Sequence, residues 1–181
     1  ALVNSAHAER LNQIWQIDAS PADVMLIEGR HSIYLAIDVF SRRVKVLATK
    51  TPRAAGVGLL IRRAILAWGV PEAIKIDNGS DFKASATQRL FAALGIEVED
   101  SRPYSPREKG MVERAIGTFQ RDLAGLPGFI GHSVADRKVI EGRKSFSQRM
   151  GADERELFGV DMDLAEFQQW CDDWSDRIYA S

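Results

Sequence analysis

The sequence IYLAIDVFSRRVKVLA, residues 33–48, decides the fold. Residues 33–40 are a nearly unbroken apolar run, which is typical of a strand buried on both faces. Residues 44–48 form a second run after the polar turn 41–43, and residues 14–18 read IWQID, which predicts an earlier strand with an acid near its end. We expect these three successive strands to form an antiparallel meander.

Helix and strand signals alternate further along the chain. Thr51 and Pro52 predict the N-cap and first residue of a helix that ends before Gly69. Short strands are predicted at residues 72–77 and 96–99, with a helix between them. The expected order is β-β-β-α-β-α-β-α, an α/β fold with a mixed five-stranded sheet flanked by helices.

Residues 105–108, SPRE, have the capping-box pattern and open the last of these helices. Its predicted core stripe contains Val112, Ala115, Ile116, Phe119 and Leu123. Glu113 lies beside that stripe, so its side chain can reach the neighbouring sheet. An acid in that place is either a site residue or a half-exposed surface charge.

Three acids stand out by their position along the chain. Asp18 lies near the predicted end of the first strand, Asp77 ends the fourth, and Glu113 follows after 35 intervening residues. Transfer of a phosphodiester calls for two divalent ions roughly 3.5–4 Å apart, and such hard ions prefer carboxylate oxygens. If the strands of Asp18 and Asp77 are neighbours, about 4.8 Å apart, their carboxylates can converge on the same ions. With 25 acidic residues in the chain, however, an arbitrary triple would usually be solvated surface.

The text around these acids resembles the catalytic core of the DDE transposase and retroviral integrase superfamily, over roughly residues 14–124. The motifs that carry the resemblance are IWQID at 14–18, YLAIDVFSR at 34–42, IDNGSDF at 76–82, YSP at 104–106 and GMVER at 110–114. The resemblance implies an RNase H-like fold and two Mg²⁺ or Mn²⁺ ions held by Asp18, Asp77 and Glu113. It also implies cleavage of DNA and transfer of a 3′-OH end.

Beyond residue 125 the chain is most similar to phage Mu-type transposases, in the sequence LPGF at 126–129 and a tryptophan segment near Trp170. We therefore divide the chain into an RNase H-like catalytic core, residues 1–125, and an extension, residues 126–181. The start at Ala1 rather than at a methionine favours a piece cut from a longer protein.

Charge is distributed unevenly along the chain. Residues 126–150 hold five Lys and Arg against two acids, whereas residues 151–181 hold two against nine. The basic part predicts a mobile connector whose Arg143 and Lys144 follow a phosphate backbone. The acidic part predicts an amphipathic helix from about Asp163 that buries an aromatic face.

Further candidate residues each have a structural alternative. Asn78 is either a substrate or phosphate contact or only part of an Asn-Gly turn. Lys109 either contacts DNA or forms an i,i+4 ion pair with Glu113 in the metal-free state. Asp38, within an apolar run, is expected at a strand end or in a hydrogen bond rather than as a fourth metal ligand.

We therefore expect a polynucleotidyl transferase that acts on element ends and target DNA as a homo-oligomer. The alternatives are an RNase H-like nuclease or resolvase without strand transfer, and a catalytically silent scaffold bound to DNA. No apolar run approaches the ~20 residues that span a bilayer, and the single cysteine cannot form an internal disulfide. These features predict a cytoplasmic protein on the DNA of a bacterial host cell, without a membrane partner.

Overall fold

The computed structural model describes residues 7–50, 54–76, 80–100, 110–142 and 154–180 of the chain. The strands are β1 Ile14–Leu26, β2 Gly29–Asp38, β3 Val44–Thr49, β4 Ala73–Ile76 and β5 Glu97–Asp100. The helices are α1 Ala54–Trp68, α2 Ser80–Lys83, α3 Ser85–Ala93, α4 Gly110–Asp122, the 3₁₀ helix η2 Leu123–Gly125, α5 Val134–Gly142, α7 Glu154–Phe158 and α8 Leu164–Ala180.

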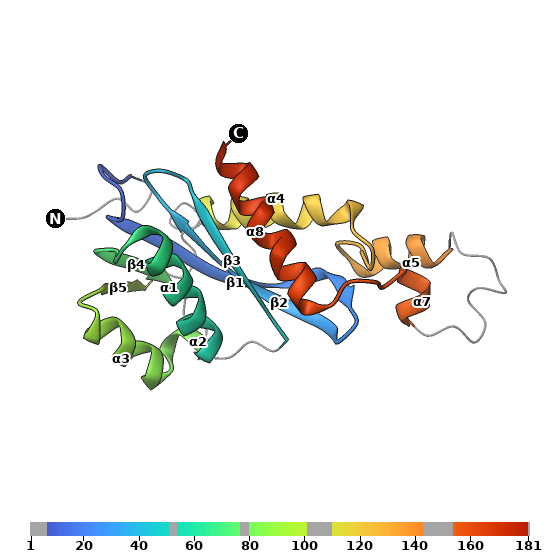
Figure 1. Cartoon of the computed structure of the whole chain (residues 1–181), viewed down its shortest axis with the longest axis horizontal. Helices are drawn as coiled ribbons and strands as arrows, with labels where there is room; N and C mark the ends of the chain where they lie inside the picture. The colour runs from blue at the N-terminus through green and yellow to red at the C-terminus, as the bar shows by residue number, and fades with distance from the viewer. Residues whose placement is uncertain (1–6, 51–53, 77–79, 101–109, 143–153, 181) are drawn as a thin grey trace.

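The strands form one mixed sheet in the order β3-β2-β1-β4-β5 (Figure 1). β1 pairs with β2, and β2 with β3, in antiparallel fashion, whereas β4 is parallel to both β1 and β5. The predicted meander and the predicted mixed five-stranded sheet are therefore confirmed. The first and fourth strands are neighbours, as the convergence of the first two acids requires.

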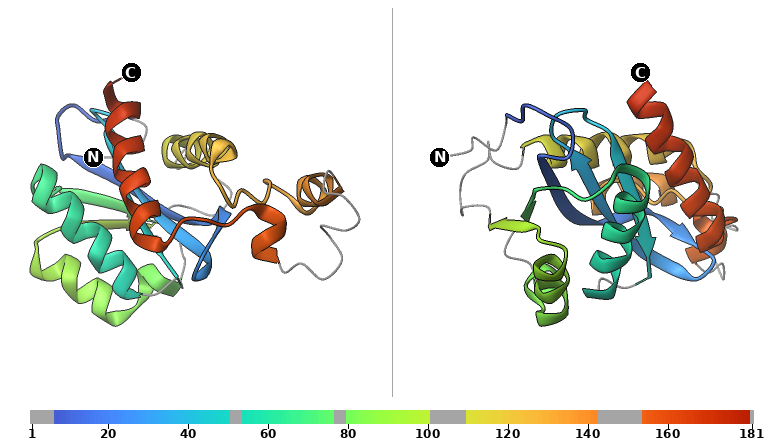
Figure 2. Two further views of the ribbon diagram at one scale, coloured as in Figure 1. Left: turned by 45° about the vertical axis from the view of Figure 1, so that its right-hand side comes forward. Right: turned by 60° about the vertical axis from the view of Figure 1, so that its left-hand side comes forward.

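Helices cover both faces of this sheet, and β1 sends alternate side chains to each (Figure 2). Trp15 and Ile17 are buried in the cluster that contains α1 and α3. Ile14 and Val24 are buried in the opposite cluster, which contains α4 and α8. The sheet thus has an α1 face and an α4 face.

β1 is longer than the sequence predicted, so Asp18 lies within the strand rather than near its end. The polar and proline residues after Asp18 hide the continuing alternation in which Ala22, Val24 and Leu26 are buried. A register shift between Pro21 and Met25 interrupts the regular pairing with β2 at the residue that lacks an N–H donor. The described pairing with β4 ends earlier, at Gln16.

Residues 128–130 are bonded to β1, within the segment 126–150 for which the sequence predicted a mobile connector. The N–H of Met25 donates to the Gly128 carbonyl at 2.8 Å, and that of Ile130 to the Asp23 carbonyl at 3.0 Å. Gly128 has φ +86°, and a Cβ there would lie 2.2 Å from the Met25 oxygen, so the contact requires glycine. This strand-like contact leads directly into α5.

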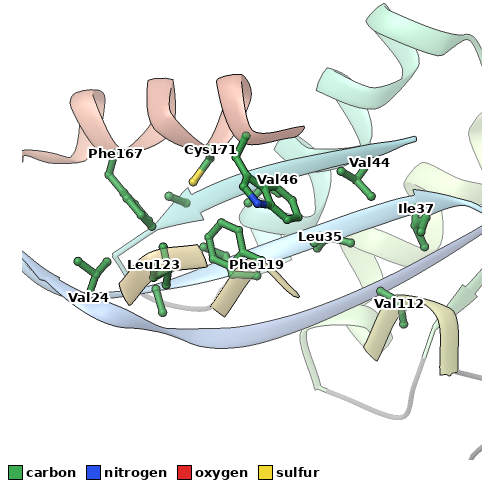
Figure 3. Packing of buried hydrophobic residues seen from close by; sticks show 14 of the residues in the cluster. Val24, Leu35, Ile37, Val44, Val46, Val112, Phe119, Leu123, Phe167 and Cys171 are labelled. Carbon is green, nitrogen blue, oxygen red and sulfur yellow. The ribbon is translucent and has the colours of Figure 1, made fainter. Parts of the chain in front are cut away.

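The acidic tail forms α8, which confirms the predicted amphipathic helix. Phe167, Cys171 and Trp174 are buried on its inner face, while Trp170 is half-buried. Figure 3 shows Phe167 and Cys171 pointing from α8 toward the sheet. Gln168 accepts the Ala48 N–H at 2.8 Å and donates to the Val46 carbonyl at 2.9 Å, which fastens α8 to edge strand β3.

Within the described ranges, we find no helix with the length and apolar character needed to cross a bilayer.

Candidate active site

Asp18 is placed by β1 on the α4 face of the sheet. It follows Ile14 and Gln16 at alternate positions, and Ile14 is buried beside α4 residues. The carboxylate is partly buried, and its Oδ1 accepts the N–H of Ala19 at 2.8 Å. The Asp18 carboxylate is therefore partly accessible to solvent, and a backbone hydrogen bond restricts its orientation.

Glu113 is placed by the first turn of α4. Val112 and Phe119 of this helix are fully buried against the sheet, whereas Glu113 is exposed. The sequence expectation that Glu113 lies beside the core stripe is therefore confirmed.

A hydrogen bond connects the strand of Asp18 with the helix of Glu113. The buried Oε1 of Gln16 accepts the N–H of Val112 at 3.1 Å. Gln16 lies two residues before Asp18 on the same strand face, and Val112 immediately precedes Glu113 in the chain. The two acids, 95 residues apart in sequence, are therefore carried by elements that touch beside both of them.

Most of the remaining predicted site residues lie outside the described parts of the chain. β4 ends at Ile76, and Asp77 is the next residue. The residues that fall outside are Asp77, Asn78, Lys109, Arg143 and Lys144. Their roles stay predictions.

Lys75 is a polar residue of this face that sequence reasoning missed. It is 6% exposed and is in register with Gln16 on β1 and with Glu99 on β5. Side chains in register on neighbouring strands share a face, so an ammonium group lies among the polar groups of the α4 face. A lysine in the four-residue apolar strand AIKI was the signal that could have found it.

Asp38 has a structural role, as the sequence predicted. It is the last residue of β2 and is completely buried. Its carboxylate accepts the N–H of Asn12 at 3.0 Å and that of Ser41 at 2.8 Å. These bonds fix the β2–β3 turn and satisfy the buried charge.

The donor chemistry of the described pair fits a divalent hard ion. Asp18 and Glu113 supply carboxylate oxygens, which suit Mg²⁺ and Mn²⁺. Burial, with a smaller contribution from Asp172, raises the pKa of the Cys171 thiol well above its usual range, so this thiol is not a thiolate ligand. Among the described residues, no three His, Cys, Asp or Glu side chains form a group that could hold a metal ion. Asp77, the third proposed ligand, lies outside the described residues.

A cavity of about 540 Å³ lies elsewhere, between η2 and α8. Its lining includes Leu126, Trp170, Trp174 and Arg177 but neither acid of the pair.

Comparison with known proteins gives a consistent result in sequence. Residues 45–128 match the family model described as the TnsB C-terminal domain. The transposase for transposon Tn552 of Staphylococcus aureus is 27% identical over 156 residues, which cover 77% of this chain and 32% of that protein. The chain thus spans about a third of the length of this curated relative.

Solved structures share the fold. The catalytic core domain of BIV integrase aligns over 91% of this chain and 99% of its own, with a TM-score of 0.53 and 23% identity. The HTLV-2 integrase catalytic core in complex with magnesium covers 81% of this chain and 96% of its own, with a TM-score of 0.51 and 20% identity. The predicted RNase H-like fold is confirmed, and the chain is similar in sequence to a transposase and in fold to integrase catalytic cores.

Proposed function

We propose that this chain is the catalytic domain of a DNA transposase or integrase that cleaves a DNA strand and joins its 3′-OH end to target DNA. The observation that carries the proposal is the Gln16–Val112 hydrogen bond, because it brings the strand of Asp18 to the helix of Glu113. The likeness to the Tn552 transposase and to the TnsB family model supports DNA as the substrate.

In this proposal Asp18, Asp77 and Glu113 hold two Mg²⁺ or Mn²⁺ ions. When bound, such ions activate an attacking oxygen and stabilise the charge on a leaving oxygen. The magnesium in the HTLV-2 integrase core, a protein of the same fold, supports a divalent ion. Lys75, buried on the same face, offsets part of the negative charge that the carboxylates bring together.

Both reactions are in-line displacements at phosphorus. In cleavage, a water oxygen attacks the phosphorus and the bond to the 3′ oxygen breaks, which leaves a free 3′-OH. In joining, that hydroxyl attacks a target phosphodiester, and one phosphodiester bond forms as another breaks. Because the number of such bonds is conserved in joining, no nucleotide cofactor and no covalent enzyme intermediate are needed.

The proposal extends to partners and setting. The protein acts on element ends and target DNA as a homo-oligomer, in a bacterial host cell, and it resembles phage Mu-type transposases. The sequence LPGF at residues 126–129 supports the last point. Asn78, Lys109, Arg143 and Lys144 are the proposed DNA contacts.

The proposal is tested by substituting the acids in the complete protein. Asp18→Asn, Asp77→Asn and Glu113→Gln should each abolish cleavage of labelled DNA ends and their joining to a plasmid, because loss of one ligand disrupts the two-ion geometry. Folding and DNA retention should change little. Asp161→Asn, an exposed acid between α7 and α8, is the matched control and should keep both reactions.

The same assay separates the alternatives. A Glu113→Gln protein that joined DNA at a near-normal rate in Mg²⁺ would overturn the assignment of the acids. Cleavage without joining by the unsubstituted protein would indicate a nuclease or resolvase instead. Retention of DNA with neither reaction would indicate a silent scaffold.

A further inference from the structure

Two glutamines fasten α4 to β1, one on each side of the carboxylate pair. Gln16 extends from β1 and accepts the Val112 N–H at 3.1 Å. Gln120 extends from α4 and accepts the Asp23 N–H at 3.1 Å, while its Nε2 donates to the Pro21 carbonyl at 2.6 Å. The helix is thus held to the strand at two points, and Asp18 lies between them along β1.

The Gln16 bond is the one beside Glu113, because its partner Val112 immediately precedes that acid in the chain. Val112 is the third residue of the described α4, and its N–H is directed at Gln16 on the neighbouring strand. Gln16 is 1% exposed and Val112 is fully buried, so water does not replace the bond if it is lost. The Gln16 side-chain amide accepts this hydrogen bond without carrying a charge. A carboxylate in its place would add to the repulsion between Asp18 and Glu113.

Apolar packing alone does not fix how far a helix lies along a strand. Val112 and Phe119 bury area against the sheet, but the free energy of such burial is not directional. A hydrogen bond is directional, and it weakens steeply when its donor is misaligned. The Gln16 bond therefore sets the axial position of the first turn of α4, and with it the position of Glu113 relative to Asp18.

We propose that Gln16 is a positioning residue, which holds Glu113 at the separation from Asp18 that the divalent ions require. The proposal rests on the function proposed above. Gln16 does not touch substrate or ion in this proposal, and it acts through Val112. A misplacement of about 1 Å in such a site can lower a rate roughly 100-fold, which is the scale of effect to expect.

The test compares Gln16→Met with Gln168→Met in the 181-residue chain. Gln168 has the same chemistry in another place, because its side-chain amide fastens α8 to the backbone of β3. Both variants should lower the melting temperature in EDTA. Only Gln16→Met should weaken Mn²⁺ binding, by tenfold or more, when free Mn²⁺ is followed by electron paramagnetic resonance.

Two further measurements separate positioning from a general loss of structure. The Val112 amide should exchange its proton faster with solvent in Gln16→Met than in Gln168→Met, as seen by NMR. In the complete protein, Mg²⁺-dependent cleavage should fall about 100-fold in Gln16→Met and stay within twofold in Gln168→Met.

Each outcome decides something. Gln16→Met with Mn²⁺ affinity within twofold of the unsubstituted chain would overturn the positioning role. So would an equal loss of affinity in Gln168→Met, since the effect would then be general. A complete protein that bound Mn²⁺ without cleaving DNA would overturn the proposed function, while the comparison of affinities would still test Gln16. A chain without Mn²⁺ affinity would overturn both.

Discussion

Helices α4 and α8 pack on the same face of the sheet but are built for different tasks. α4 is fastened to β1 by directed hydrogen bonds and leaves Glu113 exposed. α8 buries Phe167, Cys171 and Trp174 against the sheet and against α4. The difference separates chemistry from stability: changes in α8 should alter unfolding, and changes around the first turn of α4 should alter metal binding.

Phe119 is a point where the aromatic side chains of α8 meet α4. Its ring contacts those of Trp174, Trp170 and Phe167 at centroid distances of 5.2, 5.8 and 6.3 Å. It lies six residues after Glu113, about 9 Å along the helix axis. These aromatic contacts therefore lie at the middle of α4, away from Glu113.

The largest expected effect is that of Trp174→Ala. Trp174 is 3% exposed, and its Nε1 donates to the Asp122 carboxylate at 2.8 Å, so the substitution removes packing and leaves a large void. We expect a loss of about 3–5 kcal/mol in the free energy of unfolding, measured in urea with EDTA. Trp170→Ala should cost less, because Trp170 is only half-buried.

Mn²⁺ affinity provides the control for this substitution. Asp122 lies nine residues after Glu113, so the site should keep its affinity in Trp174→Ala at temperatures where the variant is folded. A parallel fall in stability and affinity would show that α8 also shapes the site, and the separation of tasks would be wrong.

Gly128→Ala should have the next largest effect. An added Cβ would meet the Met25 carbonyl at 2.2 Å, and φ is +86°, where an L side chain is disfavoured by about 1–2 kcal/mol. We expect at least that loss in the free energy of unfolding. Gly125→Ala is the control, since nothing lies within 4 Å of its added Cβ. Equal stability of the two variants would mean that the contact of residues 126–130 with β1 does not contribute to folding.

The sequence predicted the sheet well because its strands are marked by local patterns. The predicted bounds of β2 and β3, and of the turn between them, agree with the structure within a few residues. The second half of β1 was missed, since Pro21 and the nearby polar residues break the apolar run, although Ala22 and Val24 still alternate into the core. Its partners in β2 are close in sequence, since Leu26 pairs with Gly29 across a tight turn, whereas its bridge to Phe129 is distant and has no local pattern.

For the proposed site, the sequence pointed to the candidate acids but not to the contacts around them. Asp18 and Glu113 were found because each follows a recognisable strand or helix signal. The Gln16–Val112 bond joins residues 96 apart, and a lone glutamine in a strand carries no mark of its partner. The attachment of residues 126–130 to β1 was hidden for the same reason: composition suggested a connector, whereas the bonds formed are long-range.

A smaller and pH-dependent effect is expected from Cys171. Because burial raises the thiol pKa in the folded state, the unfolded chain loses this proton first as pH rises. The protonated thiol makes its full contribution to the free energy of unfolding below the ordinary thiol pKa of about 8.5. Above that pH the contribution is lost, by about 1.4 kcal/mol per pH unit. Between pH 9 and 10.5, the unfolding free energy of the unsubstituted chain should therefore fall more steeply than that of Cys171→Ala. Parallel curves would show that the thiol ionises equally in both states.

The smallest expected effect is that of Asp163→Ala, at the N-terminus of α8. The Asp163 carboxylate accepts the N–H of Glu166 at 2.8 Å, and Glu28 accepts that of Leu164 at 3.0 Å, so two otherwise unpaired helix donors are satisfied by acids from different parts of the chain. Removal of such a cap typically costs about 1 kcal/mol, and Asp163→Ser should recover most of it because a hydroxyl oxygen can also accept the bond.

The measurement is urea unfolding in EDTA, with Mn²⁺ affinity followed in the same variants. We expect the affinity to stay unchanged, since this cap is attached to the β1–β2 turn and not to the first turn of α4. A stability loss above about 3 kcal/mol would mean that Asp163 nucleates α8 and does more than cap it, and a loss of Mn²⁺ affinity would mean that the position of α8 is transmitted to Glu113.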